Sequence, residues 1–236
     1  MDFANKFKVF YELFITNGGW KQVICVGLVN TLTIAIVGLL IGIIIGTLIA
    51  TVKVMPKYKL LPRILDRICT LYVSFFRGTP IVVQLLVAYY VLWPLFGVAL
   101  DGLKTSIIVF GFNSGAYVSE IMRAGILSID PGQTEAGRAL GLSYPATMIK
   151  IVVPQAVKNI LPTLGNEFIV LVKDTSVVTF VAATDICKTF YDLGTQRYEY
   201  FVPYIVMGLF YIVLVLIIST VLKIMERRLR RGDRNY

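Results

Sequence analysis

The sequence predicts an all-α membrane protein, a polytopic transmembrane helical bundle with about five spans. Of its 236 residues, 57% are hydrophobic, and the mean hydropathy is +0.77. Three long runs, residues 23–52, 78–100 and 201–222, contain no Asp, Glu, Lys or Arg. A helix needs ~20 mostly apolar residues to cross a bilayer, so each run is long enough. The runs also lack the alternating pattern of an outer-membrane barrel, which leaves a bundle of helices that satisfy their own backbone groups.

Residues 1–19 are expected to form an interfacial amphipathic helix before the first span. Phe3, Phe7, Phe10 and Phe14 recur at helical spacing with charged residues between them, a pattern typical of a helix lying on the membrane surface. The glycines at 18 and 19 end this helix.

The first span, residues 22–52, has a stripe of small residues at every fourth position: Gly38, Gly42, Gly46 and Ala50. Small residues at this spacing allow two helices to approach closely, so the stripe predicts a packing face. A pore lining is the alternative interpretation.

The second membrane segment, residues 61–94, contains a predicted break. Pro80 follows Gly78 and Thr79 and cannot continue a regular helix. The segment is longer than one crossing requires, so it is either a broken span or an interfacial helix followed by a span. The other spans are expected at residues 105–127, 155–172 and 201–224, with residues 173–200 outside, as a short re-entrant helix.

Basic residues follow the first and last spans and predict the orientation. Residues 53–67 contain five basic residues and one acid, and residues 223–236 contain six basic residues and two acids. Because such clusters mark the cytoplasmic side, the N-terminus is expected outside and the C-terminus inside. The expected organisation is an interfacial helix at 1–19, a transmembrane domain at 20–225 with a cytoplasmic loop at 130–154, and a basic cytoplasmic tail at 226–236.

Several function classes are disfavoured by residues that the chain lacks. It has no His, and its three Cys residues show no CxxC spacing, so neither a metal site nor a disulfide framework is predicted. No GxxxxGK[ST] phosphate loop occurs, so the chain has no evident means of binding ATP itself. The net charge of +9 comes from basic residues at span ends, which favours lipid headgroups over nucleic acid.

The cytoplasmic loop is predicted to form two short helices. Asp130 caps the first, with Pro131 in its first turn and Gln133 completing a capping box, and Gly141 ends it. Ser143 caps the second helix. A narrow, capped helix of this kind suits docking into a groove of another protein, while a simple connection between spans is the alternative.

This loop resembles the EAA loop of ABC-importer permeases. The matching residues, at that motif's spacings, are Glu135, Ala136, Gly141, Ile151 and Pro154. Gly137 and Val153 replace the motif's second Ala and its Leu. Residues 75–80, 128–133 and 171–176 also resemble the polar amino-acid branch of these permeases, so the resemblance covers about residues 20–225.

The resemblance implies a type I importer permease in a prokaryotic cytoplasmic membrane. Two permease subunits, identical or sister chains, would form the pathway, and an extracytoplasmic solute-binding protein would deliver an amino acid. A separate ABC ATPase subunit dimer would hold ATP and Mg²⁺, so no cofactor is expected on this chain. The residues implied in ATPase coupling are Glu135, Ala136, Gly137, Gly141 and Ser143.

Polar residues inside the spans are the candidates for substrate binding, because such residues are costly in a membrane. An amino acid is a zwitterion, and its two charged groups need different partners. The candidates for the ammonium group are Glu120, Glu167, Asn113 and Ser114. The candidates for the carboxylate are Arg77, the amides of Gly78 and Thr79, Asn166 and Thr175. Two acids with few cations favour a cationic amino acid.

Other interpretations of these residues stay open. Glu120 and Glu167 would instead form structural ion pairs, with Arg123 as the partner of Glu120, and Asn and Ser often serve as interhelical hydrogen-bond partners. An ion-coupled secondary amino-acid transporter would explain the intramembrane charges but not the docking loop. A membrane enzyme is disfavoured by the absence of His.

Overall fold

The computed structural model describes residues 3–230, and every element in this range is helical. Residues 231–236 of the predicted basic tail lie outside the described residues. The long helices are α3 (Val29–Val54), α4 (Leu60–Gly78), α7 (Gly102–Leu127), α10 (Val153–Asp174) and α12 (Phe201–Arg230). The shorter ones are α1 (Phe3–Tyr11), α2 (Gly19–Gln22), α5 (Ile81–Val87), α6 (Trp93–Leu95), α8 (Pro131–Ala139), α9 (Tyr144–Thr147) and α11 (Ile186–Thr195).

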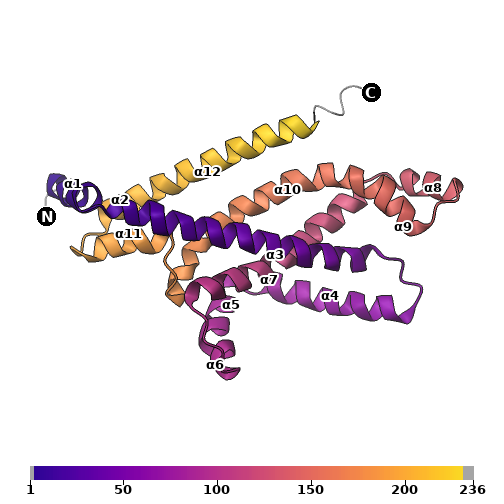
Figure 1. The fold of residues 1–236 in the computed structure, drawn as a ribbon, viewed down its shortest axis with the longest axis horizontal. Helices are drawn as coiled ribbons and strands as arrows, with labels where there is room; N and C mark the ends of the chain where they lie inside the picture. Colours follow the sequence, from indigo (N-terminus) through magenta and orange to yellow (C-terminus); the bar gives the residue numbers. More distant parts are fainter. Residues whose placement is uncertain (1–2, 231–236) are drawn as a thin grey trace.

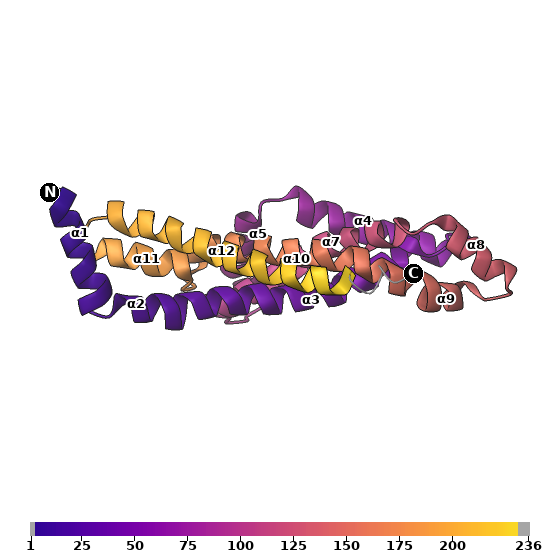
Figure 2. The same cartoon turned by 90° about the horizontal axis from the view of Figure 1, so that it is seen from above.

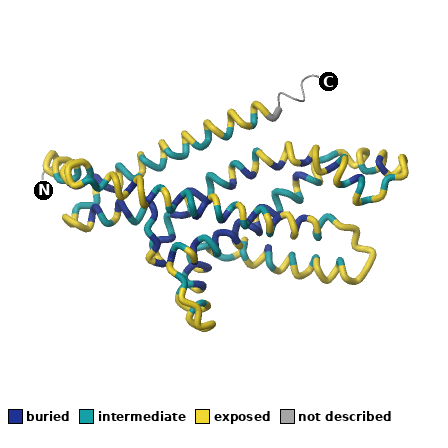
Figure 3. Tube along the Cα trace, in the orientation of Figure 1, coloured by how far each residue is buried: buried dark blue, intermediate teal, exposed yellow. Residues whose placement is uncertain are grey.

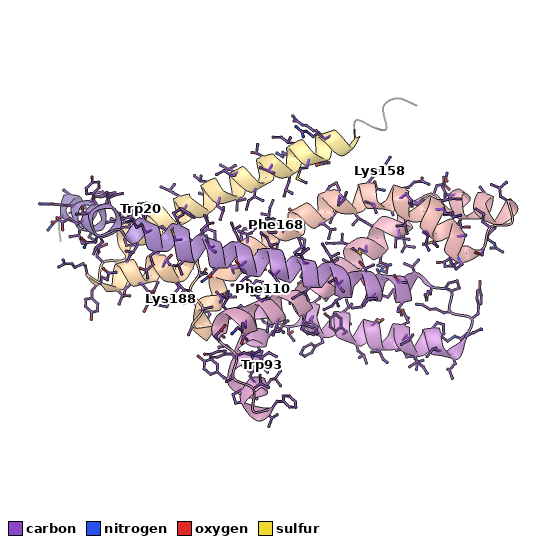
Figure 4. The ribbon with its side chains drawn as sticks, in the orientation of Figure 1. Trp20, Trp93, Phe110, Lys158, Phe168 and Lys188 are labelled. Atoms are coloured by element: carbon purple, nitrogen blue, oxygen red, sulfur yellow. The ribbon has the colours of Figure 1, made fainter. Side chains whose placement is uncertain are left out.

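The molecule is elongated along the direction of its long helices (Figure 1). α1, α2 and α11 lie at one end, and α8 and α9 lie at the other end (Figure 2). α5 and α6 leave the bundle sideways, and Trp93 lies in this projection (Figure 4). The helices between these two ends therefore connect the predicted docking loop to the rest of the chain.

Two continuous helical stretches of the described chain are long and apolar enough to cross a membrane, Gly19–Val54 and Phe201–Arg228. A third is obtained if the pair Leu60–Gly78 and Ile81–Leu95 counts as one span. Helices α7 and α10 lie where spans were expected at 105–127 and 155–172, but they carry charged residues and are not among the described stretches that meet this criterion. The number of crossings and the orientation of the chain stay predictions.

The predicted break in the second segment is present. α4 ends at Gly78, Thr79 and Pro80 are extended, and α5 leaves at 103° to α4. Proline at the start of α5 explains the site of the break, because its ring excludes the residue before it from the helical region.

The small-residue stripe of α3 is a packing face, as predicted, and its partner is α7. A Cβ added to Gly42 would lie 2.5 Å from Ser114 Oγ, and one added to Gly46 would lie 2.7 Å from Val118 Cγ1. The contact is reciprocal, because a Cβ on Gly111 of α7 would lie 2.7 Å from Ile41. The two backbones are therefore as close as glycine allows along several turns.

The main core lies where α3, α5, α7, α10 and the turn at Thr175–Val181 meet. Its centre is the fully buried Phe110, with Ile34, Leu85, Leu171 and Val178 around it. Buried residues concentrate along these helices, whereas α12 is exposed over most of its length (Figure 3). No described side chain of α12 beyond Pro203 is buried. The last helix is therefore the element least covered by this chain's own residues.

The N-terminal helix was predicted and is present as α1, continued by a π turn at Glu12–Thr16. Leu13 is buried, and the Phe14 ring stacks on Phe190 of α11 at 6.1 Å. Gly18 ends the segment with φ of +76°, as expected for a glycine at this position. The segment thus packs on α11 through Phe14, while Phe3 is 58% exposed and its ring makes an edge contact with Phe201 of α12 at 5.5 Å.

The segment before α12 also contains the short helix that the sequence suggested, α11. Asp185 is fully buried at its N-terminus and accepts hydrogen bonds from the backbone N–H groups of Cys187 and Lys188. The backbone N–H of Ile186 donates to Thr31 Oγ1 on α3. These contacts hold the turn that follows α10 in a defined position.

Candidate functional site

The break between α4 and α5 is stabilised by two side-chain amides. Gln84 Nε2 donates to the carbonyl oxygens of Phe76 and Thr79, at 3.0 and 3.1 Å. Asn113 Nδ2 on α7 donates to the Phe76 carbonyl at 3.2 Å and to Gln84 Oε1 at 3.1 Å. Carbonyls at the end of a helix need such outside partners in an apolar environment. Asn113 and Gln84 therefore hold the break open and in place.

Arg77 and Thr79 flank this break, and both have partners in the chain. The Arg77 guanidinium lies over the Tyr117 ring, 5.2 Å from its centroid. Thr79 Oγ1 donates to the Phe75 carbonyl. Beside Gly78 there is open space, since a Cβ added there would meet no atom within 4 Å. The arginine is exposed and charged next to this space, as an anion site requires.

Glu167 is a buried acid on α10. Its exposed fraction is 8%, and within residues 3–230 its carboxylate has no hydrogen bond and no ion pair. The charges that act on it electrostatically are Asp174 and Arg77. Burying a carboxylate without a partner is costly, so such a group is expected to meet a ligand or another subunit.

Asp174 shares a face of α10 with Glu167. The two residues are seven apart, or two helical turns, which places them about 10 Å apart along the helix axis. Asp174 is half-buried and likewise has no hydrogen bond or ion pair in the described chain. The substrate candidates from sequence did not include Asp174, although its spacing from Glu167 was a usable signal.

The other candidates for substrate binding are distributed elsewhere. Glu120 forms ion pairs with Lys53 (2.6 Å) and Arg123 (2.9 Å), which is the structural alternative considered above. Ser114 is fully buried against Gly42, and its hydroxyl has no partner in the described chain. The Thr175 hydroxyl donates to the Val172 carbonyl of its own turn.

Asn166 lies on a different face of α10 from Glu167. It lines an apolar cavity of about 770 Å³ between α10 and α12, together with Phe168 and Leu222. Asp174 and Arg77 thus influence Glu167 electrostatically, whereas Glu120 is held in ion pairs and Asn166 lines a different cavity.

The cytoplasmic-loop prediction of two short helices is confirmed by α8 and α9 at one end of the molecule (Figures 1 and 2). Asp130 caps α8 by accepting a hydrogen bond from the Gly132 backbone N–H at 2.7 Å. Gly141 ends α8 with φ of +76°, and Leu142 N–H donates to the Gly137 carbonyl. These bonds form the closure expected of a glycine-terminated helix.

Two details of the predicted caps are wrong. The Gln133 side chain does not complete a capping box; its Oε1 accepts a hydrogen bond from Gln155 Nε2 at 3.3 Å. Ser143 occupies the N-cap position of α9, but its side chain makes no capping hydrogen bond. Pro145 in the first turn of α9 removes one of the N–H groups that a cap would satisfy.

The loop presents both polar and apolar side chains at its surface. Glu135 and Ala136 are exposed, whereas Gly137 is buried against Thr147 of α9, where a Cβ would lie 2.6 Å from Thr147 Cγ2. Leu140 and Ile149 are 80% and 69% exposed. The sequence candidates missed these two residues, because their apolar character was equally compatible with a core position. Exposed apolar residues here indicate a surface that another protein covers.

A hydrogen bond ties the loop to the end of α3. Tyr144 OH on α9 donates to the Val54 carbonyl at 3.1 Å. Burial raises the pKa of the Tyr144 hydroxyl, so it stays protonated and able to donate near neutral pH. No motif suggested this contact, since the two residues are 90 positions apart in sequence.

Comparisons with known proteins identify the family. Residues 38–231 match the family described as "Binding-protein-dependent transport system inner membrane component". The arginine transport system permease protein ArtQ of Bacillus subtilis is 44% identical over 166 residues, which is 70% of this chain and 76% of ArtQ. The glutamine transport system permease protein GlnP of Escherichia coli is 32% identical over 71% of this chain and 77% of its own.

Solved structures agree with this assignment. A crystal structure of an amino acid ABC transporter with histidines superposes with a TM-score of 0.80 at 36% identity, covering 97% of this chain and 99% of that one. The inward-facing MetNI methionine ABC transporter gives a TM-score of 0.73 at 20% identity, over 86% of this chain and 94% of its own, which supports the fold alone. The chain therefore belongs to the inner-membrane components of binding-protein-dependent transport systems, in the polar amino-acid ABC permease branch.

Proposed function

We propose that this ABC permease subunit imports a cationic amino acid and that Glu167 and Asp174 are its cation partners. The observation that carries the proposal is the buried Glu167 carboxylate, which has no partner in residues 3–230. An extended cationic amino acid has positive groups at both ends, and two carboxylates on one helix face, about 10 Å apart, suit that separation. The arginine permease among the relatives supports the same substrate class.

The substrate carboxylate is assigned to the break between α4 and α5. Arg77 supplies a cation there, and its charge also acts on Glu167. From the sequence, the amides of Gly78 and Thr79 were candidates for binding the substrate carboxylate. By helix geometry, the free N–H groups belong to the first turn of α5, beginning at Ile81. We therefore assign the amide role to that turn.

The coupling role is assigned to the loop formed by α8 and α9. An ATPase subunit dimer that holds ATP and Mg²⁺ would receive the exposed face with Glu135, Ala136 and Leu140, while Gly137 and Gly141 shape the loop. A second permease subunit would cover α12 and the projection of α5 and α6, whose apolar side chains are exposed. A binding protein would deliver substrate at the end with α1 and α11, with the N-terminus outside. An ion-coupled mechanism is unnecessary, because the family is driven by a separate ATPase component.

The test is uptake by proteoliposomes that contain this permease with its ATPase partner and binding protein. Glu167→Gln keeps the size of the side chain and removes its charge, so arginine or lysine uptake is expected to fall at least tenfold. Asp66→Asn likewise removes one acidic charge, on α4, where Asp66 pairs with the exposed Lys57, and it is the matched control expected to transport normally. Unchanged uptake in Glu167→Gln would remove this residue from the site, and competition by glutamine as strong as that by lysine would contradict the cationic substrate.

A further inference from the structure

Tyr144 links the loop formed by α8 and α9 to the helical bundle. It is the first residue of α9, and its hydroxyl donates to the carbonyl of Val54, the last residue of α3. The last carbonyls of a helix have no partner within that helix, so this carbonyl needs one from outside. The contact joins the end of the first long helix directly to the loop.

Helices α8 and α9 are packed tightly against each other between Glu135 and Tyr144. Gly137 of α8 packs against Thr147 of α9 too closely to admit a Cβ. The Leu142 N–H to Gly137 carbonyl bond closes the connection between the two helices. A displacement of α8 therefore carries Tyr144 with it, because close-packed elements shift together and do not deform continuously.

The end of α3 that accepts this hydrogen bond is in turn fixed to α7. Lys53, next to Val54, pairs with Glu120 of α7, which in turn pairs with Arg123. Farther along, α3 and α7 are packed through Gly42, with Ser114 Oγ only 2.5 Å from where a Cβ would lie. A force applied at the end of α3 thus acts on α7 as well.

We propose that Tyr144 is a positioning residue that transmits displacement of the docking loop to α3 and, through the Lys53–Glu120 pair, to α7. The proposal rests on the docking role assigned to α8. It gives Glu120 a place in coupling and not in substrate binding. A contact that transmits motion must differ in strength between the two states of the transporter, and one hydrogen bond is sufficient for a roughly two- to tenfold effect.

The test compares Tyr144→Phe with Tyr58→Phe in the complete transporter. Both variants lose one hydroxyl near the predicted cytoplasmic side, but Tyr58 is 90% exposed. The measurements are co-purification of the ATPase, ATP hydrolysis without binding protein, and substrate molecules transported per ATP hydrolysed. For Tyr144→Phe we expect normal co-purification and normal basal hydrolysis, with transport per ATP reduced two- to tenfold. Tyr58→Phe is expected to match the wild type in all three.

Two outcomes would overturn the proposal. Wild-type transport per ATP in Tyr144→Phe would show that the hydroxyl transmits nothing. Loss of the ATPase from Tyr144→Phe would show that Tyr144 is a docking contact. Failure of the docking assignment itself is seen separately, as retention of the ATPase by both Glu135→Arg and Gly141→Asp, so the two hypotheses fail in different measurements.

Discussion

Lys53 Nζ lies 2.6 Å from Glu120 Oε1 and joins the end of α3 to α7. The side chains of the pair are 14% and 20% exposed, so both charges are largely removed from water. Arg123 shares the same carboxylate through its other oxygen, at 2.9 Å. Glu120, a candidate from the sequence for binding substrate, is therefore neutralised by two cations of its own chain.

Removing one member of this pair is expected to destabilise the bundle. Lys53→Met leaves Glu120 with Arg123 alone in a poorly hydrated place, which should lower the free energy of unfolding by about 1–3 kcal/mol. Lys53→Met combined with Glu120→Leu should recover part of that loss, because no charge is left uncompensated. Thermal unfolding in detergent measures both. The exposed pair Lys104–Asp101 is the control, and Lys104→Met should change stability by less than about 1 kcal/mol.

The close approach of α3 and α7 predicts intolerance of larger residues in the stripe. Gly42→Leu would force the helices apart, since even a Cβ lies 2.5 Å from Ser114 Oγ, and we expect a loss of about 1–3 kcal/mol or no folded protein. Gly208→Leu on α12 is the matched control, because a Cβ there meets no atom within 4 Å. Equal stability of the two variants would contradict the packing described for Gly42.

The amides at the helix break predict a specific defect in transport. Gln84→Leu removes the hydrogen bonds from Gln84 to the Phe76 and Thr79 carbonyls and leaves Asn113 with the Phe76 carbonyl as its one partner, at a cost of about 1–3 kcal/mol. Because the break positions Arg77, uptake is expected to fall as well. Gln22→Leu, an exposed amide in α2, should affect neither quantity. Normal uptake in a correctly folded Gln84→Leu protein would show that the break between α4 and α5 is not part of the substrate site.

Two different changes in the loop formed by α8 and α9 are expected to abolish binding of the ATPase. Glu135→Arg reverses an exposed charge on α8, and Gly141→Asp places a side chain where φ is +76° and the helix must end. Both variants are expected to lose co-purification with the ATPase and to lose ATP-driven uptake. Lys57→Glu also reverses an exposed charge, but in the segment between α3 and α4 and not on α8. It is the control expected to keep the partner. Retention of the ATPase by both loop variants would refute the docking assignment.

Much of this fold was predictable because its signals are local. Apolar runs, the proline at position 80, the glycine stripe and the caps of α8 act within a few residues of themselves, and the structure contains the helices, the break and the packing face that they predict. The family motif is local too, which is why the permease assignment was already possible from the sequence. Gln133 and Ser143 were misassigned where a distant residue or a neighbouring proline changed a local preference.

The roles of the polar residues depended on contacts between distant parts of the chain. Glu120 and Glu167 look alike as acids within apolar helices, yet one meets Lys53 from 67 residues away and the other meets no partner in the described chain. Asn113 and Tyr144 likewise found carbonyls on other helices. By itself the sequence determined a helical membrane permease with a docking loop, because hydrophobicity and helix boundaries are set by near neighbours. Only the tertiary structure decided which charges are neutralised, because that depends on which helices pack side by side.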